Sequence, residues 1–261
     1  MSHVEDFNTP LFSPGLVSIV MPAYNKESVL AESIGSVLGQ TFSNWELLVI
    51  DDASEDGTLQ VARKMSAQDE RIRVVTMGRN QGVAHARNAG IGQARGQFLS
   101  FLDADDLWLP TKLEVQVEFM RRRGSSFTFA SYCRFDGLGF VSGPVRIPEH
   151  VGYESLLKGN AIGCLTVMID RHQIGQVVMP NVGHEDYVAW LQILKQGHTA
   201  VGIQQDLARY RISSASISGD KRRSAIWTWN IYRKTEGLSL LHSLWCFVHY
   251  IIRSLRIRYV G

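Results

Sequence analysis

The sequence predicts an α/β fold in which a mostly parallel sheet is flanked by helices, and three observations support this fold class. Short apolar runs alternate with helical periodicity four times between positions 16 and 123. This alternation is typical of βαβ units, whose crossover connections are right-handed. Polar residues, several of them acidic, follow the apolar runs at the point where an open parallel sheet binds its ligands. The 261 residues, 45% of them hydrophobic, suffice for one such domain and an appendage.

The first half of the chain supplies strand and helix patterns in turn. Leu16 to Met21 is a continuous apolar run that ends at Pro22, and the next segment places its apolar residues at intervals of three and four. Turn and capping residues at 54–58 precede the second helical pattern. The expected strands are 16–21, 46–50, 72–76 and 98–102, and the expected helices are 27–40, 57–68 and 83–94.

Past Arg123 the pattern becomes less regular. A loop region at 137–152, which carries Gly and Pro, separates two of the expected strands. Strands are expected at 126–135, 165–169, 200–203 and 207–210, with a helix at 187–196. The sequence therefore predicts a parallel first half and a mixed second half.

The fourth apolar run ends in carboxylates at Asp103, Asp105 and Asp106. Carboxylates this close together repel one another unless a cation or a set of hydrogen-bond donors compensates. Hard oxygen ligands suit Mg²⁺ or Mn²⁺, and such a cation commonly bridges to substrate phosphates. The alternative is that Asp106 is only the N-cap of a helix over 110–123, with Pro110 in its first turn. That alternative leaves Asp103 and Asp105 unexplained.

The C-terminal segment has a different character. From Asp220 to Gly261 there are eight Lys/Arg and two Asp/Glu, a net charge of +6, whereas the rest of the chain carries −4. The near-apolar stretch 238–252 contains two histidines and is too short to span the roughly 30 Å of a bilayer's hydrocarbon core. A helix over 238–259 that lies in the membrane interface, with arginines toward anionic headgroups, is expected. The alternative is a helix that packs on the domain or on a second copy.

Two faces define that amphipathic helix. The apolar face holds Leu241, Leu244, Trp245, Val248, Ile251, Ile252 and Leu255, and the other face holds His242, Cys246, His249, Arg253 and Arg256.

Composition narrows the setting and the partners. Cys133, Cys164 and Cys246 are odd in number and match no metal-ligand spacing, so reduced thiols in a cytoplasmic protein are expected. The N-terminus lacks a basic region followed by an apolar core, so no secretory signal is expected. The basic excess is confined to the tail, which argues against a nucleic-acid partner. The expected organisation is a loose leader (1–15), an α/β domain (16–215) and a basic amphipathic helical tail (216–261).

Several strand ends carry groups that suit a nucleotide. Tyr24 could stack on a base, and Asp52 and Asp103 could accept a base N–H or hold ribose hydroxyls. Arg87 could meet a diphosphate as a planar fork. Each residue also has a structural explanation as core packing, a turn residue or a solvated helix residue. Their occurrence together at successive strand ends favours a binding site.

Four segments resemble, in order and spacing, the signature of family 2 glycosyltransferases. They are Val-Ser-Ile-Val-Met-Pro-Ala-Tyr-Asn, Glu-Leu-Leu-Val-Ile-Asp-Asp-Ala-Ser-Glu-Asp-Gly-Thr, Asn-Gln-Gly-Val-Ala-His-Ala-Arg-Asn-Ala-Gly and Phe-Leu-Asp-Ala-Asp-Asp. Members of this family are inverting enzymes with the GT-A nucleotide-diphospho-sugar transferase fold, a Rossmann-like sheet flanked by helices. The resemblance covers about residues 16–212 and implies that fold here.

The resemblance implies roles for the donor-side positions. Asp52 would meet the uracil ring, and Arg87 would lie between base and diphosphate. Asp103 and Ala104 would lie near the ribose, and Asp105 would bind the Mn²⁺ or Mg²⁺ that carries the diphosphate. The residues implied to shape the nucleoside pocket are Pro22, Ala23, Tyr24 and Glu27.

Two later segments also match family patterns. His184-Glu185-Asp186-Tyr187 looks like the Glu-Asp motif at a helix start, with Asp186 as the catalytic base and Glu185 as the second choice. The structural alternative is favourable acidic charge at a helix N-terminus. Residues 209–214 resemble the segment that closes over the donor.

The implied activity is transfer of a sugar from a UDP-sugar to a hydroxyl of a saccharide acceptor in surface-polysaccharide (lipopolysaccharide or capsule) assembly. The tail suggests a polyprenyl-diphosphate-linked acceptor and a peripheral position on the inner face of the cell membrane. A homo-oligomer contact is the alternative use of the tail. Two other functional classes are possible. A nucleotidyltransferase would need a Gly-rich phosphate loop after the first strand, and Pro22-Ala23-Tyr24-Asn25 is poor for that. A non-catalytic nucleotide-binding module would not need intact Asp105 and Asp186.

Overall fold

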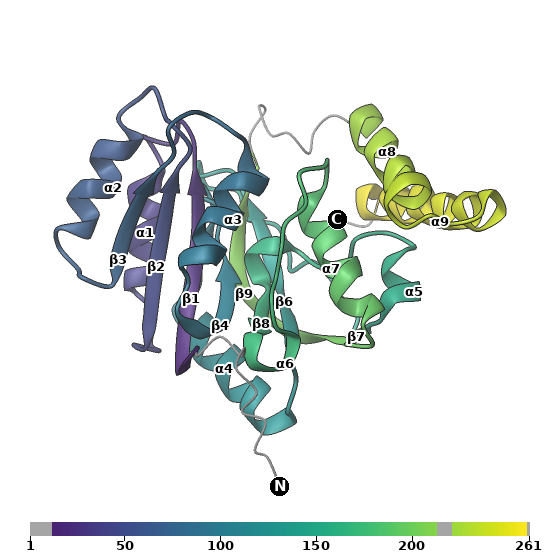
Figure 1. The fold of residues 1–261 in the computed structure, drawn as a ribbon, viewed down its shortest axis with the longest axis horizontal. Helices are drawn as coiled ribbons and strands as arrows, with labels where there is room; N and C mark the ends of the chain where they lie inside the picture. The colour runs from purple at the N-terminus through teal and green to yellow at the C-terminus, as the bar shows by residue number, and fades with distance from the viewer. Residues whose placement is uncertain (1–11, 213–220, 260–261) are drawn as a thin grey trace, which may run out of the picture.

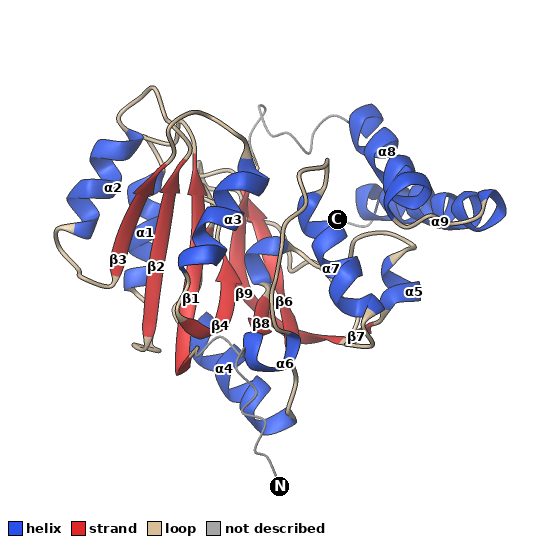
Figure 2. Ribbon diagram, viewed as in Figure 1, coloured by secondary structure: helices blue, strands red, loops and turns tan. Residues whose placement is uncertain are grey.

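A central mixed sheet organises the protein, with helices on both faces and a helical extension at one end (Figures 1 and 2). The structure, a computed structural model, describes residues 12–212 and 221–259, with side chains described as far as Ser254. Among these residues the strand order is β3-β2-β1-β4-β8-β6-β9-β5, and β7 pairs with β9. The strands are β1 (Ser13–Ala23), β2 (Trp45–Asp51), β3 (Ile72–Thr76), β4 (Gly96–Phe101), β5 (Leu107–Trp108), β6 (Phe127–Phe135), β7 (His150–Val151), β8 (Met168–Asp170) and β9 (Ala200–Arg211).

The helices cover both faces of this sheet and form the C-terminal extension. The α-helices are α1 (Leu30–Leu38), α2 (Thr58–Ser66), α3 (Val83–Gln93), α4 (Lys112–Arg123), α5 (Tyr153–Leu156), α6 (Arg171–Ile174), α7 (Glu185–Lys195), α8 (Lys221–Asn230) and α9 (Leu240–Tyr259). A 3₁₀ turn, η1, spans Cys164–Thr166, and a π-helical turn, η3, spans Ile231–Thr235.

The first four predicted strands and the three helices between them are confirmed. β1 pairs in parallel with β2 and β4, and β2 pairs in parallel with β3. Figure 2 shows the arrowheads of these strands at one edge of the sheet, so their carboxyl ends lie together. The mixed second half is also confirmed, because β8 runs antiparallel to both β4 and β6.

Alternation along the strands divides the core into two layers. In β1, Val20 packs into the layer that includes α3 and α7, whereas Ile19 and Met21 pack into the layer that includes α1 and α4. Successive side chains of a strand point to opposite faces, so a strand that is buried on both faces reads as a continuous apolar run. This burial explains why the apolar runs identified the strands so well.

The second half departs from prediction in two places. Cys164–Thr166 forms a 3₁₀ turn, so the strand expected at 165–169 is reduced to β8. The segments expected as separate strands at 200–203 and 207–210 form one long strand, β9, whose register against β6 shifts in the middle. The irregularity lies at the three polar residues that interrupt the apolar pattern, Gln204, Gln205 and Asp206.

The three cysteines are free thiols, as expected. Within the described chain, no helix is long and apolar enough to cross a membrane. Part of the expected leader (1–11), the boundary at 215/216, the end of the segment 209–214 and the side chains of Leu255 and Arg256 lie outside the described residues.

The C-terminal helices lie at the end of the molecule away from β3, beside α7 and α5 (Figure 1). The predicted helix over 238–259 is present as α9, and its buried side includes Ser243 and Cys246. Arg253 donates to the carbonyl oxygen of Gly159 at 3.3 Å. The opposite side is exposed and consists of Leu241, Leu244, Trp245, Val248, Ile251 and Ile252. The polar face of the helix therefore packs on the protein, and the apolar face points outward.

Helix α3 lies very close to β1, and Gly90 permits that approach. A Cβ atom at Gly90 would lie 2.5 Å from Cγ1 of Val20, whereas one at Gly92 would meet nothing within 4 Å. We expect Gly90→Ala to lower the free energy of unfolding by about 1–3 kcal/mol, because overpacking forces the helix from the sheet. Gly92→Ala is the matched control and should leave stability equal or up to about 1 kcal/mol higher. Urea denaturation measures both, and equal effects of the two variants would contradict the packing argument.

Candidate active site

The carboxyl ends of β1 and β2 carry the first group of predicted donor-side residues. Pro22 and Ala23 are the last residues of β1 and are buried, and Tyr24 follows with 40% of its surface exposed. The backbone N–H of Asp52 donates to the carbonyl oxygen of Ala23 at 2.9 Å, which keeps the two strands paired to their ends. This edge therefore presents one exposed aromatic ring beside a buried carboxylate.

Asp52 is held by the loop that precedes α3. Its Oδ1 accepts the backbone N–H of Gln81 at 2.9 Å, and its Oδ2 accepts that of Gly82 at 2.7 Å. Gly82 has φ of 88°, a left-handed conformation that glycine adopts without strain. The two amides fix the carboxylate, and each of its oxygens keeps a second lone pair for another donor.

Glu27 lies on the loop between β1 and α1 and is tied to the start of α2. Its Oε2 accepts the backbone N–H of Gly57 at 2.9 Å, and its own N–H donates to Asp56 at 3.2 Å. An acceptor at a helix N-terminus satisfies a donor that the helix leaves unpaired. Glu27 thus shapes this rim by holding two loops together.

Lys26 forms an ion pair with Asp105. Its Nζ lies 2.6 Å from Asp105 Oδ2, and both side chains are partly exposed. The backbone N–H of Lys26 donates to Thr58 Oγ1 at 2.7 Å, so the loop that carries the ammonium group is anchored. The repulsion expected among the carboxylates after β4 is therefore partly offset by a lysine from the loop after β1.

Arg87 joins the acidic loop after β4 to the start of α7. Its Nη2 lies 2.7 Å from Asp103 Oδ1, and its Nη1 lies 2.5 Å from Glu185 Oε1. Arg87 is 4% exposed, so both ion pairs are formed by a guanidinium group that is removed from water. A buried charge requires such partners, and the loss of either would be costly.

Glu185 and Asp186 differ in their availability. Glu185 forms an ion pair with Arg87, whereas Asp186 Oδ1 accepts the backbone N–H of Tyr187, at 2.7 Å. The hydrogen bond from Tyr187 leaves Asp186 Oδ2 open to a further donor among the described residues. Burial raises the pKa of both carboxyl groups, and the opposing charge of Arg87 lowers the pKa of each. A carboxylate of raised pKa with a free oxygen is suited to accept a proton near neutral pH.

The residue before this pair has unusual backbone geometry. His184 has φ of 60° and ψ of 52°, the left-handed region, and forms the N-cap position of α7. Its ring meets the Trp227 ring edge-on at 5.2 Å, and a Cβ at Gly183 would lie 2.0 Å from that indole. Non-glycine residues in this conformation persist where the surroundings hold them. Trp227 of α8 therefore packs directly on the loop that presents Glu185 and Asp186.

The end of β9 lies against the acidic loop, and this corrects one expectation. Arg211 Nε donates to the carbonyl oxygen of Asp105 at 2.7 Å, and its backbone N–H donates to Asp106 Oδ1 at 2.8 Å. Burial raises the pKa of Asp106 well above its usual value. The alternative role of Asp106 as an N-cap is wrong, because Thr111 is the N-cap of α4 and Asp106 pairs with β9 instead.

The donor set suits a divalent cation that brings its own phosphate ligands. Asp103 and Asp105 offer partly exposed carboxylate oxygens at the edge of the site. Among the described residues, no three His, Cys, Asp or Glu side chains come together as a metal cage. Mg²⁺-type cations are usually bound by one or two carboxylates together with substrate phosphates, so the residues present fit such an ion.

Other residues of the site were not found from the sequence. Lys26 contacts the predicted site residue Asp105, and Trp227 contacts His184, which directly precedes Glu185. The charges of Arg87 and Asp186 act on Cys164. Burial raises the pKa of the Cys164 thiol well above its usual value, so it is a neutral neighbour. Only Lys26 had a local signal, since it directly follows the Pro-Ala-Tyr-Asn segment.

The sequence matches the model of a known family. The family described as "Glycosyl transferase family 2" matches residues 18–170. Two relatives come from bacteria. TuaG of Bacillus subtilis (strain 168), whose name assigns it to teichuronic acid biosynthesis, is 42% identical over 93% of this chain and 97% of its own length. WfgD of Escherichia coli, named UDP-Glc:alpha-D-GlcNAc-diphosphoundecaprenol beta-1,3-glucosyltransferase, is 41% identical over 83% of this chain and 85% of its own length.

Solved structures share the fold. TarS of S. aureus, residues 1–349 in complex with UDP-GlcNAc, superimposes with a TM-score of 0.71 at 18% identity, over 90% of this chain and 71% of that one. The mannosyltransferase PcManGT of Pyrobaculum calidifontis, in complex with GDP-Man and Mn²⁺, superimposes with a TM-score of 0.66 at 19% identity. The match covers 97% of this chain and 77% of that one. The expected GT-A fold is confirmed. Since the family match spans more than half of the chain, and two relatives at 42% and 41% identity extend along most of it, the chain belongs to glycosyl transferase family 2 and is a glycosyltransferase.

Proposed function

We propose that the protein transfers a sugar from a UDP-sugar to a hydroxyl group of a lipid-linked saccharide, with inversion at C1, in bacterial surface-polysaccharide synthesis. The observation that carries this proposal is the Arg87 bridge, which brings the edge that carries Asp52 and Asp103 next to Glu185 and Asp186. WfgD acts, by its name, on a diphosphoundecaprenol-linked GlcNAc, and it is 41% identical to this chain. The TarS complex contains UDP-GlcNAc bound to the same fold.

On the donor side, each residue has a proposed role that its surroundings support. Tyr24 would lie against the uracil ring, and Asp52 would accept a ring N–H with the lone pairs that Gln81 and Gly82 leave free. Asp103, fixed by Arg87, would bind the ribose hydroxyls. Asp105 would hold a Mn²⁺ or Mg²⁺ ion together with the donor diphosphate, and such an ion would supply positive charge to offset the charge on the departing diphosphate.

On the acceptor side, Asp186 would be the general base. Its free oxygen accepts the proton of the acceptor hydroxyl while the hydroxyl oxygen attacks C1 from the face opposite the diphosphate. The C1–oxygen bond to the diphosphate breaks with its electron pair, and UDP departs. Glu185 is the weaker candidate for the base because its Oε1 forms an ion pair with Arg87 Nη1 at 2.5 Å.

The C-terminal helix would hold the protein at the membrane. The outward face of α9 is apolar, and exposed basic residues such as Lys221 and Arg222 of α8 lie in the same extension. Apolar side chains that enter the headgroup region and cations near anionic lipids both favour binding in the membrane interface. Such a position would bring the active site to a lipid-linked acceptor.

Asp186→Asn tests the proposed base. We expect a loss of about 10²–10⁴-fold in kcat, because the acceptor hydroxyl loses its proton acceptor. UDP release is measured with UDP-glucose, Mn²⁺ and an α-GlcNAc-diphosphate carrying a lipid chain, and UDP affinity should be unchanged. Glu185→Gln is the comparison variant. If it abolished transfer while Asp186→Asn remained active, Glu185 would be the base.

Lys26→Met tests the proposed metal site without turnover. The Lys26 ammonium group competes with a cation for Asp105, so its removal should tighten Mn²⁺ binding about two- to five-fold, equivalent to about 0.5–1 kcal/mol. Free Mn²⁺ is measured by electron paramagnetic resonance in the absence of nucleotide. Lys64→Met, at an exposed position of α2, is the control. Unchanged or weaker binding in Lys26→Met would place the ion elsewhere.

Paired substitutions test the membrane role. Leu244→Gln with Val248→Gln should reduce binding to liposomes containing anionic lipid about ten-fold or more, because two apolar side chains no longer favour the interface. Sedimentation with the liposomes measures the bound fraction. Leu138→Gln with Val178→Gln makes the same chemical change at exposed positions outside the tail. Equal binding by the two double variants would remove α9 from this role.

A further inference from the structure

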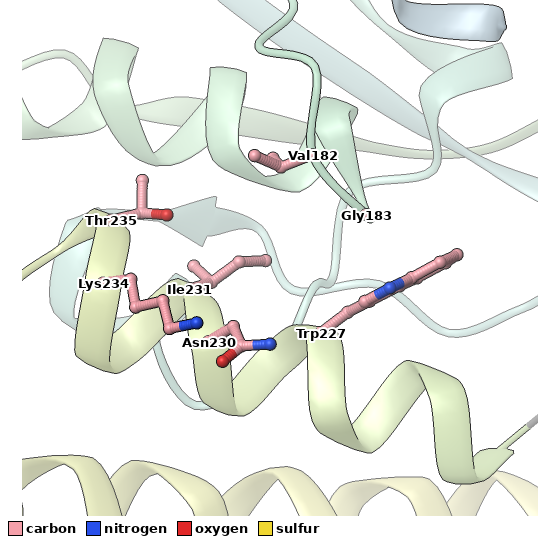
Figure 3. A pocket seen from close by; sticks show the side chains of 7 residues that line it. All are labelled: Val182, Gly183, Trp227, Asn230, Ile231, Lys234 and Thr235. Carbon is pink, nitrogen blue, oxygen red and sulfur yellow. The ribbon is translucent and has the colours of Figure 1, made fainter.

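A cavity lies between the loop before α7 and the α8–η3 segment, outside the strand edge that carries the donor-side residues (Figure 3). Its volume is about 270 Å³. Ligand pockets begin at about 300 Å³, so the space suits a single sugar together with its diphosphate rather than a longer saccharide. The lining residues are Val182, Gly183, Trp227, Asn230, Ile231, Lys234 and Thr235.

The lining combines an aromatic wall with polar groups. Figure 3 shows the Trp227 indole at one end and the side chains of Asn230, Lys234 and Thr235 along one side. No carboxylate of the described side chains pairs with Lys234, so its ammonium group is available to an anion. An aromatic surface, an amide, a hydroxyl and one cation together suit a sugar that carries a phosphate.

The cavity is next to the proposed base. Gly183 forms part of its wall and precedes the Glu185–Asp186 pair by two residues, and Trp227 contacts the intervening His184 at 5.2 Å. A ligand held here therefore touches the same loop that presents Asp186. Figure 3 shows that the opposite wall comes from the α8–η3 segment, which belongs to the extension with the exposed apolar face.

A π-helical turn supplies three of the residues that line the cavity, Ile231, Lys234 and Thr235. Ile231–Thr235 form that turn, and Glu236 at its end accepts hydrogen bonds from Tyr153 at 2.6 Å and Lys195 at 3.0 Å. Glu236 therefore neutralises Lys195, whereas Lys234 lines the cavity and has no such partner among the described side chains. Such turns are rare and often occur at functional sites.

We propose that this cavity binds the acceptor, taking the diphosphate of a lipid-linked saccharide on Lys234 and its first sugar against Trp227, with the lipid toward the exposed side of α8 and α9. This inference rests on the proposed function, because it requires a diphosphate-linked acceptor. It adds a binding site distinct from the donor edge. The sugar would then present its hydroxyl toward the loop of Asp186.

Lys234→Gln tests the site by direct binding. Lys234 is exposed at the surface of η3, so the substitution should not disturb folding. The probe is α-GlcNAc-diphosphate with a short alkyl chain, titrated calorimetrically against the full chain. We expect its affinity to fall about ten-fold, as a charge-assisted hydrogen bond is lost, with UDP affinity unchanged. Lys64→Gln makes the same chemical change at an exposed position of α2, outside the cavity, and should bind the probe like the wild type.

Two further arms separate the possible ligands. Inorganic pyrophosphate and free GlcNAc should each bind at least ten-fold more weakly than the probe, because each fills only part of the cavity. Pyrophosphate binding as tight as the probe would overturn the sugar contact. Equal losses in Lys234→Gln and Lys64→Gln would show general charge attraction and overturn the site. Trp227→Phe, which keeps a ring there, should weaken the probe less than Lys234→Gln. A wild-type protein that binds no UDP would instead refute the proposed function itself.

Discussion

The buried guanidinium of Arg87 is the constraint on which the arrangement of the site depends. It is almost entirely removed from water and is neutralised by Asp103 and Glu185, which come from opposite halves of the sequence. A buried cation with two anionic partners is stable only while both remain in place, because an unpaired charge in a low-dielectric interior is strongly destabilising. The strand-end loop after β4 and the first turn of α7 are therefore fixed relative to each other by electrostatics.

That constraint leaves the two acidic residues of α7 chemically different. Glu185 forms the ion pair with Arg87, so its negative charge is balanced. Burial raises the pKa of the Asp186 carboxyl group, which keeps one oxygen free. Two neighbouring carboxyl groups can serve separate roles when their surroundings differ in this way. The backbone supports the same division, since the left-handed His184 turns the chain so that α7 begins at Glu185. Burial, Arg87 and the backbone around His184 thus set much of the position and the pKa values of the two carboxyl groups.

The sequence predicted the first half of the fold because buried parallel strands produce a local, continuous apolar signal. It also placed Asp52, Asp103 and Asp105 just after parallel strands, whose carboxyl ends lie at one edge of the sheet. It could not predict that Lys26 meets Asp105 or that Asp106 meets Arg211, because each contact joins segments separated by 79 and 105 residues. The short strand β5 and the 3₁₀ turn at Cys164 were missed for the same reason. Two-residue pairing and one-turn geometry depend on neighbours in space rather than on periodicity.

The apolar face of α9 points outward because the domain packs against the other side of the helix. Ser243 and Cys246 are small, so the helix approaches the domain closely on that side, and Arg253 reaches the carbonyl oxygen of Gly159. The larger apolar residues on the other side cannot be covered by the same surface, and their exposure to water is unfavourable by about 25 cal/mol per Å². A helix with that orientation is most stable where an apolar medium meets its outer face. Because α8 both packs on α9 and contacts the loop of His184 through Trp227, a membrane that fixed α9 would also steady the loop that presents Asp186.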